Sequence, residues 1–363
     1  MNDTPNHRQA QLRGALSVVA ASILWGTTGT AATFAPAVSP LAIGAVAMGL
    51  GGLLQALYAA RHIAVQWGSL RARWRLVLPG ALAVAVYPLA FYSSMRLSGV
   101  AVGTVVSIGS APVAAALIER FADRKPLSRQ WILGALLGIG GAALLSLAGH
   151  SPAAPGPTAP VPPTPGPGPD SWTSIVGILL GLLAGTTYAL YSWAAHRLTG
   201  HGVTPRAAMG AIFGLGGILL MPVLAATGGP LLESWRGVGV GAYMATVPMF
   251  AGYLLFGWGL ARVGAGTATG ISLLETVVAA VLAVLVVGER LPALAWLGAA
   301  VVLASLFILT PGQTGAAATR RAGANPKKAA PPTPSAGDLP APAPGQQRGA
   351  KQQAGAQPQQ QNP

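Results

Sequence analysis

The sequence contains no cysteine and very little charge. The absence of cysteine among 363 residues excludes disulfides, thiolate metal sites and cysteine nucleophiles. Only 8% of the residues are Asp, Glu, Lys or Arg, whereas a soluble domain has about 25%. So few charged groups cannot cover a surface that faces water. The composition therefore excludes an ordinary soluble protein.

Long apolar runs are what the sequence has in abundance. Hydrophobic residues make up 52% of the chain, and its mean hydropathy is +0.55. Ten windows are nearly free of charge, each about the 20 residues that an α-helix needs to cross the hydrocarbon. They cover residues 14–34, 39–60, 76–95, 99–118, 130–149, 172–194, 207–227, 238–260, 264–287 and 293–311. We therefore expect an all-α polytopic membrane protein with ten transmembrane helices.

The distribution of Lys and Arg indicates the orientation of these helices. If the N-terminus is cytoplasmic, all but three of the 22 basic residues fall in cytoplasmic segments; the exceptions are Arg96, Arg236 and Arg290. The bias predicts a multi-pass protein with both termini in the cytoplasm, whose basic loops contact lipid headgroups. It also explains the net charge of +14 without a nucleic-acid partner.

Two low-complexity segments divide the chain. Residues 150–171 are rich in Pro, Gly and Ala and predict an extended periplasmic linker. Residues 312–363 predict a disordered cytoplasmic tail, and residues 1–13 a cytoplasmic N-terminus. The helices then form two groups of five, in residues 14–149 and 172–311.

The two groups resemble each other in sequence. Residues 24–30 (LWGTTGT) match 183–189 (LAGTTYA), and Leu133-Gly134-Ala135 matches Leu297-Gly298-Ala299. The order of the matches is conserved, which indicates a duplication. Because each group has an odd number of spans, the second starts on the opposite side of the membrane. The sequence thus predicts two inverted five-helix repeats, an architecture of many secondary transporters.

These residues resemble a known family. Trp25-Gly26-Thr27, Pro112, the ending Gly288 to Leu291 and the segment 188–198 (YALYSWAAHRL) are similar to the EamA family of the drug/metabolite transporter superfamily. The resemblance implies an inner-membrane carrier, an exporter by our expectation, for a small metabolite, amino acid or drug. This chain departs from the family where Thr276, preceded by Glu275, replaces a common proline.

Glu275 is the only charged residue between positions 263 and 288. A charge at the centre of a membrane helix costs about 2.5–3.5 kcal/mol on insertion scales, and a carboxyl group reduces this cost by keeping its proton. Two functional roles follow: carrying a coupling proton, or pairing with a cationic group of the substrate. The alternative is a protonated carboxyl group that holds two helices together.

Other polar residues are expected beside Glu275. Thr269, Ser272 and Thr276 have the spacing of one helix face. Thr104, Ser107 and Ala111 form a similar face of the fourth span, with Pro112 beside that face. Further candidates for the substrate or coupling site come from the first, third and sixth spans: Trp25, Thr27, Thr28, Tyr92, Thr186, Thr187 and Tyr188. The alternative for all of them is helix packing. Pro88 and Pro248 predict kinks that are static or act as hinges.

Three rival functions remain to be weighed. A membrane-embedded enzyme lacks a second embedded carboxylate, and the five histidines fall outside the spans or at their ends. A channel would need a charge ring or filter loop, and none is present. A scaffold or receptor stays open as the alternative.

The sequence has no nucleotide-binding motif and predicts no cofactor. We expect a secondary carrier of a neutral, zwitterionic or weakly cationic solute, because embedded Lys and Arg are missing. Gly134 and Gly138 predict either internal packing or a homodimer face.

Overall fold

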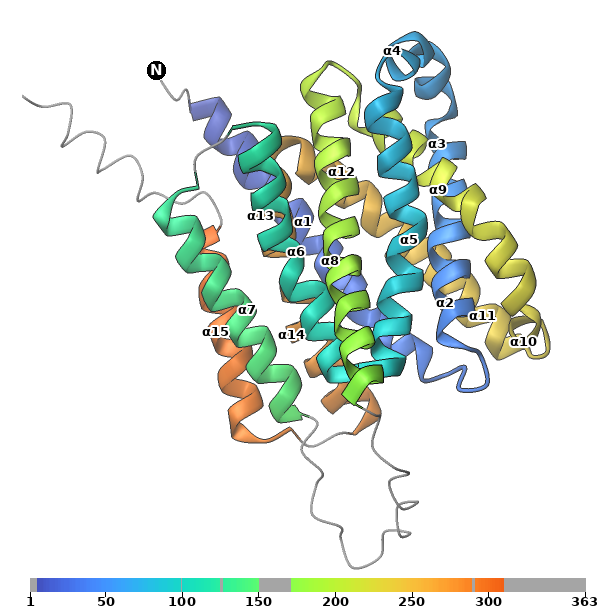
Figure 1. Ribbon diagram of the computed structural model, residues 1–363, viewed down its shortest axis with the longest axis vertical. Coiled ribbons are helices and arrows are strands. Elements are labelled where there is room, and N and C mark those ends of the chain that lie inside the picture. Colours follow the sequence, from blue (N-terminus) through green and yellow to red (C-terminus); the bar gives the residue numbers. More distant parts are fainter. Residues whose placement is uncertain (1–4, 99, 125–126, 150–170, 289–290, 310–363) are drawn as a thin grey trace, which may run out of the picture. The chain divides into compact units, whose positions relative to one another are not determined.

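The computed structural model describes residues 5–98, 100–124, 127–149, 171–288 and 291–309. The predicted tail, all of the predicted linker except Ser171, and residues 289–290 lie outside this part of the chain. The first half is formed by α1 (Pro5–Ala32), α2 (Pro40–Ala45), η1 (Val46–Leu50), α3 (Gly51–Val65), α4 (Trp67–Ala72), α5 (Trp74–Ser98), α6 (Val100–Ala122) and α7 (Arg129–Gly149) (Figure 1).

The second half repeats this order of long helices. It is formed by α8 (Ser171–Gly200), α9 (Pro205–Thr227), α10 (Gly229–Leu232), α11 (Trp235–Met244), η2 (Ala245–Ala251), α12 (Gly252–Val263), α13 (Ala265–Ile271), α14 (Leu274–Leu282), η3 (Ala283–Val287) and α15 (Ala293–Leu309). The elements η1, η2 and η3 are π-helical turns. No strand occurs in the described residues.

Eight helical stretches of the described chain are long and apolar enough to cross a membrane. They are Gln9–Ala32, Pro40–Val65, Trp74–Ser98, Gly103–Ala122, Trp172–Gly200, Pro205–Thr227, Trp235–Val263 and Ala265–Val286. Arg129–Leu145 and Ala293–Leu309 are apolar but shorter. Large apolar side chains such as Leu57, Leu136 and Phe307 are exposed. Outward-facing apolar side chains are typical of a surface in contact with lipid, so the protein is a multi-pass membrane protein.

The second long helix of each half begins with the same N-terminal cap. Ser39 precedes Pro40 at the start of α2, and its hydroxyl accepts a hydrogen bond from the amide of Ala42. Thr204 precedes Pro205 at the start of α9, and its hydroxyl accepts from the amide of Ala207. Each hydroxyl satisfies an amide that the first turn leaves free, and proline at the first position sets the backbone angle.

The helix contacts between the halves are reciprocal. The third helix of one half packs on the first helix of the other in both directions: α5 on α8, and α12 on α1. The fourth helices do the same, with α6 on α8 and α14 on α1. The second helices, α3 and α9, and the fifth helices, α7 and α15, pack on their own counterparts. Two equivalent halves related by a two-fold axis produce this pattern.

Small residues allow α7 and α15 to lie in close contact (Figure 1). A Cβ atom on Gly141 would lie 2.8 Å from the carbonyl oxygen of Gly298, which is shorter than a normal contact. Gly134 faces Ile308 and Leu309, and Gly138 faces Ser305. The glycine pair of the sequence motif therefore packs on α15 within the same chain.

The ninth predicted span is not one continuous helix. The sequence predicts a single helix over 264–287, but α13 ends at Ile271 and α14 begins at Leu274. The amides of Glu275 and Thr276 each bond a carbonyl three residues earlier, at 3.0 and 3.1 Å. The Ser272 hydroxyl also donates to the carbonyl oxygen of Thr269. Serine and threonine hydroxyls that bond backbone carbonyls bend helices, which explains a tight turn here without a proline.

Candidate functional site

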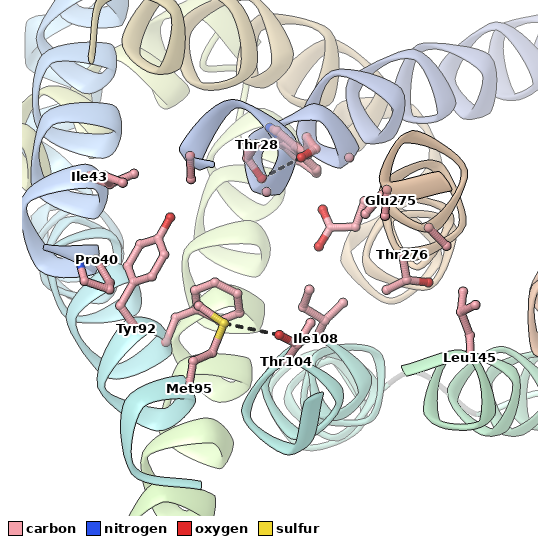
Figure 2. Close-up of a pocket in the computed structure, with 18 of the residues that line it drawn as sticks. Thr28, Pro40, Ile43, Tyr92, Met95, Thr104, Ile108, Leu145, Glu275 and Thr276 are labelled. Carbon is pink, nitrogen blue, oxygen red and sulfur yellow. Dashed lines mark hydrogen bonds between the residues drawn. The ribbon is translucent and has the colours of Figure 1, made fainter. Parts of the chain in front are cut away.

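Glu275 lies in the first turn of α14, directly after this break. Gly26 of α1 packs against it: a Cβ atom on Gly26 would lie 2.9 Å from the Glu275 carbonyl oxygen. The Glu275 carboxylate extends into a cavity (Figure 2). Within the described part of the chain, no hydrogen bond or ion pair joins this carboxylate to another residue.

The cavity, which we name the large cavity, has a volume of about 400 Å³ and lies between the two halves. The first half contributes residues of α1, α2, α5, α6 and α7, and the second half contributes Met244 and residues around α14. Its wall opposite Glu275 includes Tyr92 and Met95 of α5 (Figure 2). Five of the residues predicted from the sequence line it: Trp25, Thr28, Tyr92, Glu275 and Thr276.

A second, smaller space of about 60 Å³ adjoins the large cavity. We name it the aromatic chamber, because its lining includes Trp25, Tyr87, Phe91, Tyr92, Tyr188 and Tyr253. Glu275 lines both spaces and thus lies at the boundary between them. Thr28 also belongs to both linings. A ligand that fills both spaces would pass the carboxylate.

Trp25 connects the chamber to the second half of the chain. Its indole nitrogen donates a hydrogen bond of 2.9 Å to the carbonyl oxygen of Pro248 in η2. Its ring packs on Tyr253 and Phe256, with centroid distances of 4.8 and 5.2 Å. Trp25 is only 6% exposed. Trp25 therefore packs in the core and also forms part of the wall of the site. The predicted role in the site and the alternative of helix packing both apply to it.

Aromatic side chains fill the region beyond the chamber. The hydroxyl groups of Tyr191 and Tyr253 share a hydrogen bond of 2.8 Å, and Phe213 packs on both rings. Tyr191, Phe213 and Phe256 are fully buried. This packing separates the chamber from the far ends of α6 and α8.

Polar contacts hold those far ends together. Asp123, directly after the end of α6, forms an ion pair of 2.7 Å with Arg197 of α8 and accepts a hydrogen bond of 3.0 Å from the indole of Trp193. Glu119 accepts a bond of 3.1 Å from the amide of Ala265, where α13 begins. We name these five residues the closing cluster. The large cavity lies toward the opposite end of α6, where Thr104 and Ile108 line it.

The remaining predicted residues lie outside both spaces or touch only one. Tyr188 lines the aromatic chamber alone. Thr27 bonds the Tyr243 hydroxyl at 2.8 Å and lines a separate surface hollow. Thr186 is exposed and bonds a carbonyl of its own helix. The others lie away from the two spaces: Ser107, Pro112, Thr187, Thr269 and Ser272. Hydroxyl groups of three of these, Thr187, Thr269 and Ser272, bond backbone carbonyls nearby in the chain.

Sequence reasoning missed several residues of the site. Phe91, Met95 and Ile108 line the large cavity, but apolar residues in a membrane helix look the same whether they face a cavity or a neighbour. Gln55 is a different omission. Gln55, in α3, is 1% exposed, and its side-chain amide donates to the carbonyl oxygen of Met249 at 3.4 Å. A polar amide side chain inside an apolar span is visible in the sequence, so Gln55 could have been identified from the sequence as a candidate buried polar residue.

Comparison with known proteins identifies the family. The pattern of the EamA-like transporter family matches residues 12–147 and 175–310, that is, both halves. The chain belongs to this family. A protein of Bacillus subtilis (strain 168) called "Uncharacterized transporter YwfM" is 31% identical over 299 residues, which are 81% of this chain and 93% of that protein. The resemblance noted in the sequence is thus confirmed, and a transporter role is supported.

A solved structure has a similar fold. It is described only as "Crystal structure of protein", aligns with a TM-score of 0.62 and is 18% identical in sequence. The alignment covers 85% of this chain and 98% of that one. At this identity the match speaks for the fold of the EamA-like chain and not for its substrate.

Proposed function

We propose that this EamA-like protein is a secondary carrier that moves a small neutral, zwitterionic or weakly cationic solute by alternating access, as an exporter in a bacterial inner membrane. Ten helices would cross the bilayer, α7 and α15 included, as two inverted five-helix repeats with both termini in the cytoplasm. The observation that carries the proposal is a cavity between two equivalent halves that are held closed by polar contacts at the far ends of their helices.

The distribution of basic residues indicates on which side of the membrane this cavity opens. With the N-terminus in the cytoplasm, α1 ends and α2 begins at the periplasmic face, and the large cavity lies at these ends. The closing cluster then lies at the cytoplasmic face. The structure would represent the outward-open state of the carrier.

The duplication indicates what the opposite state would expose. Leu133 and Leu297 occupy matching positions in the two repeats. By the same separation along the sequence, Ala279, which lines the large cavity, matches Ala115 of α6. In the same way, Thr104 matches Ala268, and Ile108 matches Ser272. Ala115, Ala268 and Ser272 are all fully buried. In an inverted repeat, the two halves exchange conformations between the two states, so these buried positions would line the inward-facing cavity.

Cysteine labelling tests this prediction without knowledge of the substrate. The natural chain has no cysteine, so Ala279→Cys and Ala115→Cys each introduce one reactive group without background. We expect a membrane-impermeant maleimide to label Ala279→Cys from the periplasmic side and Ala115→Cys from the cytoplasmic side of inverted vesicles. Ala21→Cys, at a buried position outside the large cavity and the aromatic chamber, is the unreactive control.

Other outcomes would favour other functions. A scaffold or receptor with one rigid state would leave Ala115→Cys unlabelled from either side. A channel would allow both positions to react from the same side of the membrane. Either result would contradict a carrier.

Glu275 is the residue proposed to couple transport or to bind the solute. Its carboxylate is the only acidic group in the described lining of the large cavity. Flux of a metabolite and drug panel into inverted vesicles, with and without a proton gradient, would be compared for the wild type and Glu275→Gln. Loss of gradient-dependent flux supports the role, and equal flux in both would reduce Glu275 to a structural residue.

A further inference from the structure

We propose that the two spaces form one binding site for a protonated primary amine with an apolar tail. The ammonium group would occupy the aromatic chamber beside Glu275, and the tail would fill the large cavity. This inference rests on the proposed carrier function and narrows its substrate class from any small uncharged or weakly cationic solute to an amphiphilic amine.

The charge of the lining favours a cation. Glu275 is the single carboxylate in the described linings of both spaces, and no Lys, Arg or His occurs in them. The carboxylate is partly accessible and has no internal partner in the described chain. A negative group in an apolar wall with no positive neighbour is stabilised most by a positive ligand.

The walls of the small chamber favour the same kind of ligand. Six aromatic rings line it, and neighbouring rings lie close together: Tyr87 and Tyr188 have centroids 5.6 Å apart, and those of Trp25 and Tyr253 are 4.8 Å apart. A cation within about 6 Å of an aromatic face is attracted by the ring electrons, most strongly where water is excluded. A cation in a chamber this narrow lies near several rings at once.

Size restricts the cation further. The chamber measures about 60 Å³, a few times the roughly 10–15 Å³ of cavity that a single water molecule requires. An ammonium group with its first carbon is small enough for this space, and a trimethylammonium group, which is bulkier, would fit it less well. The large cavity, at about 400 Å³, lies in the size range of sites for small molecules. Its wall is mostly apolar, with Phe91, Ile108 and Leu145 among its residues.

An acidic group on the ligand would find no cationic partner in the described linings. A helix N-terminus can bind a carboxylate through its free amides, and α14 begins beside the site. However, the amides of Glu275 and Thr276 are already bonded to the carbonyls of Ser272 and Leu273. A ligand carboxylate would also lie near that of Glu275. The site therefore selects an amine over the corresponding amino acid.

A matched series of ligands tests the inference. Phenethylamine, phenylalanine, 3-phenylpropionate and phenethyl alcohol share an aromatic tail and differ in their head groups. Their binding to the purified full chain in nanodiscs would be measured by calorimetry at about pH 8, where an alkylamine stays protonated, with empty nanodiscs subtracted. The N,N,N-trimethyl derivative of phenethylamine tests the size of the chamber. Binding requires no transport, so this measurement can fail while the labelling of the two cysteine variants still supports a carrier.

We expect phenethylamine to bind best and to lose about tenfold or more in affinity in Glu275→Gln. Glu233→Gln makes the same chemical change at an exposed position and should leave binding unchanged. Ala47→Val narrows the aromatic chamber without touching the described lining of the large cavity and should weaken binding as well.

Four results would overturn the inference. These are equal binding of all head groups, a preference for the zwitterion or the anion, binding of the trimethyl derivative as tight as that of the primary amine, and no measurable binding of any member of the series. If Ala47→Val fails to fold, the comparison of Glu275→Gln with Glu233→Gln still decides the question.

Discussion

The indole nitrogen of Trp25 lies 2.9 Å from the carbonyl oxygen of Pro248 and donates a hydrogen bond to it. This bond joins the first helix of one half to the π-helical turn η2 of the other. The next carbonyl along, that of Met249, accepts from the Gln55 amide at 3.4 Å. Two side chains of the first half thus bond consecutive carbonyls of η2. A carbonyl oxygen can accept two hydrogen bonds, so these carbonyls can bind side chains within the irregular turn η2.

Trp25→Phe should lower stability by about 1–2 kcal/mol, because the buried Pro248 carbonyl loses its side-chain donor while most of the ring packing is kept. Unfolding of the purified protein by SDS would measure the change. Trp172→Phe is the control, since Trp172 is 69% exposed. Equal stability of the two variants would show that the bond to Pro248 contributes nothing.

Gln55→Leu should leave the free energy of unfolding unchanged or raise it by up to about 1 kcal/mol. The Gln55 Oε1 atom is buried and has no hydrogen-bond partner among the described residues, and the amide bond is long. Leucine keeps nearly the same volume and removes the burial penalty. Gln55→Ala, which leaves a cavity, should be less stable than both. A large loss of stability in Gln55→Leu, measured by the same unfolding titration, would show that Oε1 has a partner.

Gly141→Ala and Gly140→Ala should have opposite effects, although the two residues are neighbours in α7. A Cβ atom on Gly141 would lie 2.8 Å from the carbonyl oxygen of Gly298, whereas one on Gly140 meets nothing within 4 Å. Gly141→Ala should lose about 1–3 kcal/mol by forcing α7 and α15 apart. Gly140→Ala should be neutral or slightly stabilising, because alanine favours the helix. A similar thermal unfolding midpoint for the two variants would contradict this packing.

The apolar windows of the sequence predicted where helices form, because a helix that satisfies its own backbone is required wherever the chain meets lipid. Glu275 was also identifiable, since one carboxylate in an apolar run demands a polar surrounding. Trp25, Thr28, Tyr92 and Thr276 were grouped with it, and all of them line the large cavity.

The polarity of a residue did not by itself predict whether its side chain lines the cavity or packs between helices. Thr186 and Thr187 are adjacent, yet one is exposed and the other buried, and each satisfies its hydroxyl with a carbonyl of its own helix. A helical threonine therefore needs no polar neighbour. The break at Ser272 involves a bond between its hydroxyl and the carbonyl of Thr269, but the hydroxyl of Thr187 forms such a bond in an unbroken helix, so these residue types did not by themselves predict a break.

Asp123→Asn should weaken the closing cluster. Asparagine has nearly the same size and still offers an oxygen to Trp193, but the ion pair with Arg197 is lost. The Arg197 side chain is 43% exposed, so the effect is modest. We expect the population ratio of the inward-open to the outward-open state to rise about two- to fivefold.

The most direct test of alternating access is the labelling of Ala115→Cys and Ala279→Cys, each measured with and without Asp123→Asn. Because the two cavities would belong to exclusive states of one molecule, the fraction of accessible Ala115→Cys should rise while that of Ala279→Cys falls by the same amount. A rise at Ala115→Cys with unchanged or increased labelling of Ala279→Cys would show that the two ends open independently, and would contradict the carrier mechanism.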